Sequence, residues 1–388
     1  MKRNIYLVIL AQFLCTSLWF AGNAVLPDLI IAYNFNSAFL AHLTSAVQFG
    51  FIAGTLVFAL LGISDRFSPS LVFSVSALFA AVFNLAMAIS NLQDYSFLIF
   101  RFFTGFFLAG IYPVGMKIVA DYEEKGLGKS LGFLVGALVL GTAFPHLLKG
   151  LFNGVLNWEY VIYGTSILTV LGGLLIAFFV PDGPFRKAGS KIKLKAIFTS
   201  FKTIEFRKAA LGYFGHMWEL YAFWAFLPLI LSTNFKLNQS VLNVSILSAI
   251  IIGSGFLACG FSGIISQRLG VKFTAKSALF LSGICCLLSP LFILGNSILL
   301  LMFLVFWAIV VIADSPLFST LVAQNCPPQN KGTSLTIVNC IGFSITIFSI
   351  QLMQMLSGFL SIQYLFLVLA VGPIFGLLSL KDKKMSTF

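Results

Sequence analysis

The sequence predicts an all-α integral membrane protein whose twelve transmembrane helices form two pseudo-symmetric six-helix bundles. Three observations predict this class. Hydrophobic residues make up 59% of the 388 residues and charged residues only 9%, against about 25% charged residues in ordinary soluble domains. Apolar stretches of membrane-spanning length occur twelve times along the chain. Short pieces of the first half also reappear in the second half, 201 to 204 positions later.

The overall composition excludes several other classes of protein. A mean hydropathy of +1.01 and 44 Phe residues exclude a disordered chain, a nucleic-acid binder with basic stripes and a secreted disulfide scaffold. The cysteines lie in or beside apolar runs and lack the paired spacing of a metal site. We therefore interpret them as packing residues and expect neither a metal nor another cofactor. They are Cys15, Cys259, Cys285, Cys286, Cys326 and Cys340.

Each predicted span follows from length, because a helix needs about 20 apolar residues to cross a hydrocarbon core of about 30 Å. Polar residues, Gly or Pro separate the spans, as in Ser64-Asp65-Arg66 and in the stretch from Asp121 to Lys129. The predicted spans are residues 5–26, 40–62, 70–90, 96–117, 130–149, 160–180, 208–231, 243–264, 273–293, 298–321, 333–356 and 361–379.

The distribution of Lys and Arg predicts the orientation. With a cytoplasmic N-terminus, 21 of the 24 basic residues fall on the cytoplasmic side, leaving Arg101, Lys149 and Lys236 towards the other side. This asymmetry predicts a multi-pass protein of a bacterial inner membrane with both termini in the cytoplasm. The start of the chain resembles a signal peptide, but we interpret it as an uncleaved first span, because its removal would spoil the arrangement in six plus six spans.

An internal repeat divides the chain. Ala24-Val25-Leu26-Pro27 matches Ala225-Phe226-Leu227-Pro228, and Ser64-Asp65-Arg66 matches Ser266-Gln267-Arg268, in the same order along the chain. Gly128, Ser130 and Leu131 likewise match residues 332, 334 and 335. Parallel repeats of this kind are typical of several transporter folds. We therefore predict bundles over residues 1–180 and 208–388, joined by a basic cytoplasmic linker at residues 181–207.

Two loops and one helix resemble the major facilitator superfamily over essentially the whole chain. The family's loop between spans two and three combines Gly with Asp and Arg, and Gly62 to Pro69 and Gly263 to Lys272 each keep part of that pattern. Arg101 to Gly105 resembles the family's Arg-x-x-x-Gly element in span four. The resemblance implies a carrier that works by alternating access, with gating loops at Asp65, Arg66, Gln267 and Arg268. We expect the carrier to be a monomer.

Ionisable residues inside apolar spans are the first candidates for function, because each costs at least about 2.5 to 3.5 kcal/mol to insert. We predict substrate binding or coupling by Arg101, His216, Glu219 and Asp314, and the resemblance implies that their spans line a central cavity. Each has a structural alternative. Arg101 could pair with a backbone carbonyl or helix end, His216 could neutralise Glu219 by a hydrogen bond, and Asp314 could pair within a packed interface.

Aromatic and polar residues of the same spans add two further candidates, Asn23 and Trp224, which would supply a polar handle and an aromatic wall if they face inward. Interfacial belts or lipid-facing packing would explain such residues equally well. A desolvated carboxyl group such as Glu219 could bind and release a proton, so we expect coupling to protons.

The predicted function is secondary active transport of a small solute: a polar organic anion, a zwitterion or an amphiphile. Proton-driven efflux of drugs or metabolites is the nearest alternative, although span five lacks the Gly-Pro-x-x-Gly-Gly ending of proton-driven drug antiporters. A channel or a non-transporting sensor are alternatives from other classes. We expect no enzymatic activity, because motifs such as His-Glu-x-x-His and Gly-x-Ser-x-Gly are missing from the sequence. No nucleic-acid partner is expected.

Overall fold

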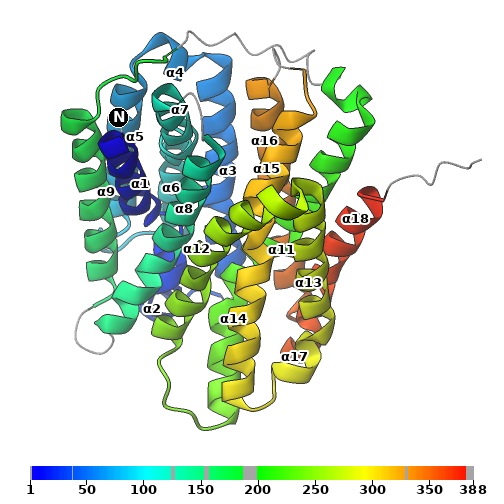
Figure 1. The fold of residues 1–388 in the computed structure, drawn as a ribbon. Coiled ribbons are helices and arrows are strands. Elements are labelled where there is room, and N and C mark those ends of the chain that lie inside the picture. Colours follow the sequence, from blue (N-terminus) through cyan, green and yellow to red (C-terminus); the bar gives the residue numbers. More distant parts are fainter. Residues whose placement is uncertain are drawn as a thin grey trace, which may run out of the picture.

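A computed structural model describes residues 2–36, 38–123, 127–152, 157–186, 199–327 and 331–381. The described residues are helices joined by short turns, without a strand among them (Figure 1). They contain twelve helical segments that are long and apolar enough to cross a membrane. These segments coincide with the twelve predicted spans to within several residues at each end, so the predicted fold class is confirmed.

The first six spans are built from eight helices, because two of the spans are interrupted. Span one consists of α1 (Lys2–Thr16) and α2 (Ala21–Tyr33), and span four of α6 (Asp94–Leu108) and α7 (Tyr112–Tyr122). The short α4 (Ile63–Arg66) lies in the loop between spans two and three. The remaining spans are α3 (Phe39–Leu60), α5 (Pro69–Ala86), α8 (Leu127–Leu151) and α9 (Glu159–Phe179).

The last six spans show the same kind of interruption in span ten, which consists of α14 (Ser297–Ala313) and α15 (Ser315–Gln324). Span twelve combines α17 (Ile362–Leu365), the 3₁₀-helix η2 (Phe366–Ala370) and α18 (Val371–Ser379). Span seven, by contrast, is one continuous helix. The unbroken helices are α11 (Ile204–Leu237), α12 (Val244–Leu269), α13 (Val271–Phe292) and α16 (Lys331–Leu356).

The interruptions of spans four and ten follow from proline. Pro113 and Pro316 stand in the first turn of α7 and α15, where the missing N–H of proline costs nothing. These two prolines are 203 positions apart, which agrees with the offsets of the sequence repeat. The two halves of the chain therefore break the same helix of each repeat at the same place.

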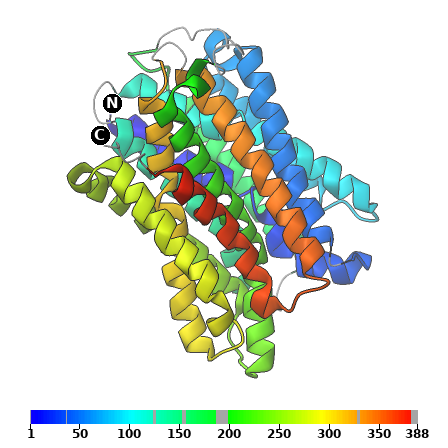
Figure 2. The ribbon, with the colours of Figure 1, turned by 90° about the vertical axis from the view of Figure 1, so that its right-hand side faces the viewer.

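Two seams join spans one to six with spans seven to twelve. Along one seam α8 packs against α12, and along the other α3 packs against α16, which run side by side in Figure 2. Within the first half, α3 and α6 cross so closely that a Cβ on Gly50 would lie 1.8 Å from the carbonyl oxygen of Phe102. A Cβ on Gly105 would lie 1.9 Å from that of Val47. Small residues thus permit close helix contact in a lipid environment.

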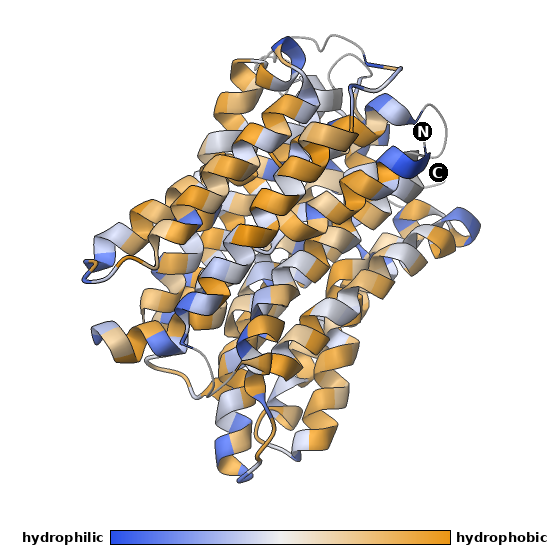
Figure 3. Ribbon diagram, turned by 90° about the vertical axis from the view of Figure 1, so that its left-hand side faces the viewer, coloured by the Kyte–Doolittle hydropathy of each residue, from blue (hydrophilic) through white to orange (hydrophobic). Residues whose placement is uncertain are grey.

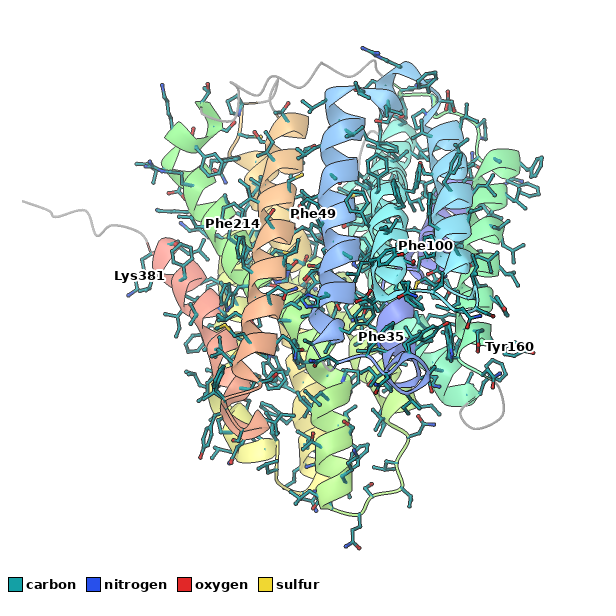
Figure 4. The ribbon with its side chains drawn as sticks, turned by 180° about the vertical axis from the view of Figure 1, so that it is seen from behind. Phe35, Phe49, Phe100, Tyr160, Phe214 and Lys381 are labelled. Atoms are coloured by element: carbon teal, nitrogen blue, oxygen red, sulfur yellow. The ribbon has the colours of Figure 1, made fainter. Side chains whose placement is uncertain are left out.

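The outer surface is apolar around the waist of the molecule, and polar residues gather at the two ends (Figure 3). Large hydrophobic side chains project from this surface, among them Phe49, which is 59% exposed, and the labelled Tyr160 at 50% (Figure 4). A water-soluble protein would bury such side chains, whereas a lipid-facing surface requires them. The chain is therefore a multi-pass membrane protein.

The predicted linker falls only partly within the described residues. Lys187, Lys191, Lys193 and Lys195 lie outside them. Arg186 pairs with Asp182 and donates a 2.8 Å hydrogen bond to the carbonyl of Phe67. Ser200 forms a 2.9 Å hydrogen bond with Ser334 of α16. The flanks of the linker are thus fastened to opposite halves, and the division into two bundles joined by this linker stays a prediction.

Candidate transport site

All four predicted ionisable residues lie inside the bundle. Arg101, Glu219 and Asp314 are fully buried and His216 is 1% exposed. They form three separate arrangements: Arg101 lies in the first half, whereas His216 with Asp314, and Glu219, occupy the second half. A buried charge is costly unless it is paired or hydrogen-bonded, so the partners of each group define what it can do.

Arg101 of α6 forms hydrogen bonds to the backbone at the interruption of span one. Its Nη1 donates a 2.8 Å hydrogen bond to the carbonyl of Leu18, and its Nη2 donates to the carbonyl of Trp19. Both carbonyls follow the end of α1, where the helix leaves acceptors unpaired and carries partial negative charge. No carboxylate of the described residues lies within ion-pair distance of the guanidinium. The structural alternative for Arg101, a helix-end partner, is the arrangement found.

His216 and Asp314 meet across the interruption of span ten. His216 Nδ1 of α11 lies 2.8 Å from Asp314 Oδ1, at the junction of α14 and α15. The contact has ion-pair distance without the alignment of a hydrogen bond, and neither side chain has another hydrogen-bond partner among the described residues. The expected alternative of a bond between His216 and Glu219 is not found; His216 turns to Asp314 instead.

Glu219 lies one turn further along α11, and donors surround its carboxylate. Oε1 accepts a 2.6 Å hydrogen bond from the indole Nε1 of Trp307 and a 3.3 Å contact from the thiol of Cys286. Oε2 accepts a 2.9 Å hydrogen bond from Ser282. These donors belong to α13 and α14 of the same half. The arrangement supplies hydrogen bonds to both oxygens and therefore supports a buried carboxylate.

Aromatic rings from both halves meet at the centre of the molecule. Trp19 lies between Phe51 of its own half, at a ring-centroid distance of 4.8 Å, and Phe343 and Tyr221 of the other half, at 5.6 and 6.0 Å. The rings are buried. We call this group the aromatic collar; it consists of Trp19, Phe20, Phe51, Tyr221, Trp224 and Phe343. Trp224 is buried in this group, and its role as an aromatic wall of a substrate site stays a prediction.

Hydrogen bonds across the two seams lie on the side of the collar remote from the N-terminus. Gln48 accepts from Thr346, Gln351 donates to Ser45 at 2.9 Å, and Asn243 donates to the carbonyl of residue 150 at 3.0 Å. These bonds join α3 to α16 and the end of α8 to the start of α12. The halves are therefore fastened together at the collar and at the end of the bundle opposite to the N-terminus.

Several polar groups of the first half are buried beside the collar without a hydrogen-bond partner among the described residues. They include Trp19 Nε1, Gln48 Nε2, Asn23 Oδ1 and His146 Nε2. Asn23 itself donates a 2.7 Å hydrogen bond to Thr44, so only its oxygen is open. Sequence reasoning missed Gln48, because the search followed charge. An amide in the middle of an apolar span is the signal that could have identified it.

The predicted gating loops lie at the end of the bundle that carries the N-terminus. Asp65 pairs with Lys117, which also donates a 2.8 Å hydrogen bond to the carbonyl of Ser64. Both partners belong to the first half, so this contact fastens the loop to span four. Arg66, Gln267 and Arg268 are exposed. The role of these loops in holding the halves together stays a prediction.

Comparison with known proteins identifies the class. A family model described as Major Facilitator Superfamily matches residues 8–350, and the chain belongs to this family. The twelve candidate membrane spans agree with membership of this transporter family.

Individual relatives say less about this chain than the family model does. The 4-hydroxybenzoate transporter PcaK of Acinetobacter baylyi is 30% identical over 169 residues, which is 42% of this chain and 35% of the relative. A bicyclomycin resistance protein homolog of Haemophilus influenzae is 21% identical over 330 residues, covering 78% of this chain and 77% of the relative. The chain spans only about a third of the length of the first two curated relatives it matches.

Among solved structures, a human organic anion transporter superposes with a TM-score of 0.75 and 16% identity, covering 98% of this chain and 99% of that chain. This likeness concerns the fold alone.

Proposed function

We propose that this protein carries a small organic anion with an aromatic ring across a bacterial inner membrane by alternating access, coupled to protons. It acts as a monomer with both termini in the cytoplasm. One observation carries the proposal: a collar of aromatic rings from both halves includes Trp19, whose backbone carbonyl accepts a hydrogen bond from a buried arginine that has no carboxylate partner among the described residues.

The charge of Arg101 favours an anion as substrate. A guanidinium stays protonated in proteins, and the carbonyls of Leu18 and Trp19 neutralise it only in part, because the end of a helix carries about half an elementary charge. Trp19 therefore combines one backbone acceptor for Arg101 with a ring at the seam. An anion that approaches the collar would experience the remaining positive charge in a low-dielectric surrounding, where charges interact strongly.

The collar favours a flat ring on that anion. Stacked aromatic pairs contribute about 0.5–1.5 kcal/mol beyond the burial of their surface, and rings from both halves could face one substrate ring when the halves move apart. The open donor groups of Trp19 and Gln48 and the open oxygen of Asn23 would then hold polar substituents. The printed substrate of the Acinetobacter relative, 4-hydroxybenzoate, has this chemistry.

Efflux of a larger apolar compound is a second candidate. The bicyclomycin resistance homolog matches more of the chain than the other curated relatives reported above, and an aromatic collar also suits an amphiphile. The buried Arg101 distinguishes the two proposals, since an uncharged compound would gain nothing from it.

Counterflow into proteoliposomes tests the proposed substrate class. Vesicles loaded with unlabelled 4-hydroxybenzoate should take up labelled 4-hydroxybenzoate with saturation, and a pore would show none of this exchange. Two competitors separate the features of the substrate: cyclohexanecarboxylate keeps the charge without the ring, and 4-hydroxybenzyl alcohol keeps the ring without the charge. Benzoate, which keeps both the ring and the charge, should compete well. Cyclohexanecarboxylate and 4-hydroxybenzyl alcohol should each compete weakly. Equal competition by the alcohol would contradict an anion site.

A further inference from the structure

The two buried acidic groups of the second half differ in how completely their hydrogen-bonding capacity is satisfied. The carboxylate of Glu219 has donors at both oxygens: Trp307, Ser282 and Cys286. In contrast, both oxygens of Asp314 and both ring nitrogens of His216 are buried without an aligned hydrogen bond among the described residues. Buried polar groups are normally paired, and an exception calls for a functional explanation. The imidazole and the carboxylate nevertheless lie 2.8 Å apart.

The pair lies at the joint between the two helices of span ten. Asp314 ends α14 and precedes α15, and its backbone carbonyl accepts the 2.9 Å bond from the amide of Phe318 that opens α15. Pro316 prevents the helix from continuing without interruption. A helix N-terminus favours negative charge nearby, so the joint stabilises the ionised carboxylate, while the surrounding apolar core favours a neutral pair.

Among the described residues, Glu219 is the only other buried charged group near the pair. The buried titratable groups on the packed elements are Tyr213, Glu219 and Tyr221 of α11, Cys259 of α12, Cys285 and Cys286 of α13, and Cys340 of α16. On α8, which also touches α15, His146 lies beside Phe20 of the collar. No buried Lys or Arg is found among the described residues of the second half. A proton on the pair is therefore the simplest way to neutralise the carboxylate.

We propose that His216 and Asp314 together form the proton-coupling site of this transporter, and that Glu219 is a positioning residue that holds α11 to α13 and α14. The proposal deepens the proposed function and rests on it for the coupling of transport to protons. One proton is exchanged. With it, the pair is an imidazolium beside a carboxylate and has no net charge; without it, a neutral imidazole faces a carboxylate and the pair carries one negative charge.

The loss of that proton to water is balanced and needs no other reactant. The negative pair is costly in the apolar core, so the proton leaves when the joint between α14 and α15 opens to water. This step would link movement of span ten to the protonation state. Glu219 is assigned no proton exchange in this scheme, because three donors hold both of its oxygens in hydrogen bonds to α13 and α14.

The histidines of this chain allow a direct test without a substrate. The sequence contains three, His42, His146 and His216, so protein labelled with ¹⁵N-histidine gives a small set of ring nitrogen signals. His216→Gln assigns the signal of His216. In the wild-type protein this signal should change with pH between the values of an imidazolium and a neutral ring. In Asp314→Asn its midpoint should move to lower pH by about one unit or more, because an adjacent anion favours the imidazolium.

The matched control is Glu219→Gln, which keeps the shape of the side chain and should leave the midpoint of His216 unchanged within about 0.3 units, because His216 contacts Asp314 and not Glu219. A signal of His216 that stays constant with pH would overturn the proposal, as would a larger shift in Glu219→Gln than in Asp314→Asn. The wild-type titration alone remains decisive if a variant fails to fold. Because no substrate is used, a wrong substrate class would leave the result intact.

Discussion

The two halves of this protein join equivalent pairs of spans through hydrogen bonds to a charged group of opposite sign. In the first half, span four reaches span one through Arg101, which donates to the carbonyls of Leu18 and Trp19. In the second half, span ten reaches span seven through Trp307, which donates to the carboxylate of Glu219. Leu18 and Glu219 are 201 positions apart, the offset of the matching Pro27 and Pro228.

The difference explains why span one is interrupted and span seven is continuous. A cation needs acceptors, and in an apolar bundle an interrupted helix supplies them from its own backbone. A carboxylate needs donors instead, and these come from the side chains of Trp307, Ser282 and Cys286. The repeat therefore teaches that one architecture can carry either sign of charge, provided that local structure supplies complementary partners.

Replacing the cation of the first half should have the largest effect. Arg101→Lys keeps the charge, but an ammonium on a flexible stem cannot serve both carbonyls in the geometry of the planar fork. Loss of one charge-assisted hydrogen bond costs about 1.5–3 kcal/mol, so thermal unfolding in detergent should occur at lower temperature and counterflow should fall at least about tenfold. Arg207→Lys, at an exposed position, is the control and should behave like wild type. Normal counterflow would return Arg101 to a purely structural role.

The corresponding contact of the second half should be weaker but measurable. Trp307→Phe removes the 2.6 Å bond to Glu219 and keeps a ring against Phe223. A hydrogen bond to a charged group contributes about 1.5–3 kcal/mol, and one between neutral groups about 0.5–1.5 kcal/mol. Trp218→Phe is the matched control, since its indole donates to the backbone carbonyl of Val368. Trp307→Phe should therefore lower the temperature of thermal unfolding more than Trp218→Phe does. An equal decrease in the two variants would argue against an ionised Glu219.

Two glycines of α8 test how tightly the seam between α8 and α12 is packed. A Cβ on Gly150 would lie 2.4 Å from Ile246 Cγ1 and 2.8 Å from its backbone nitrogen, whereas a Cβ on Gly132 would be 3.6 Å from the nearest atom of Cys259. Gly150→Ala should separate α8 from α12 at that end and destabilise the protein by about 1 kcal/mol. Gly132→Ala should be neutral or stabilising. Differential scanning fluorimetry distinguishes them, and equal melting temperatures would argue against a tight seam.

The smallest effect belongs to the loop of the first half. Lys117 and Asp65 form an ion pair whose side chains keep 21% and 29% exposure, and such pairs are worth about 0–1 kcal/mol. Asp65→Asn should therefore change the free energy of unfolding by less than about 1 kcal/mol, and less still at high salt. A larger loss would mean that the loop does more than fasten span four.

The sequence predicted the fold well and the partners of the charged residues poorly. Length and hydropathy determine where spans lie, so the twelve stretches coincide with twelve helices. The rarity of charge in apolar spans singled out Arg101, Glu219 and Asp314, all of which are buried. Spacing along one helix, however, says nothing about neighbours from other helices. His216 and Glu219 share a face of α11, yet their partners come from different elements.

The local sequence also could not predict the interruption of span one. No proline stands between Ser17 and Phe20, and the break exists together with Arg101, 83 positions away from Leu18. From the sequence, aromatic walls could be predicted only on the condition that the residues face inward, because ring contacts between the halves depend on how α3 and α16 pack. Long-range contacts of this kind are set by tertiary packing.

We assign recognition of the anion to the first half of the protein and binding of the proton to the second half. The most direct test of this division compares pH-driven accumulation of labelled 4-hydroxybenzoate with its counterflow, in proteoliposomes containing wild type or Asp314→Asn. We predict that wild type does both, and that Asp314→Asn exchanges the probe but no longer concentrates it. Undiminished accumulation by Asp314→Asn would contradict the division of labour between the halves.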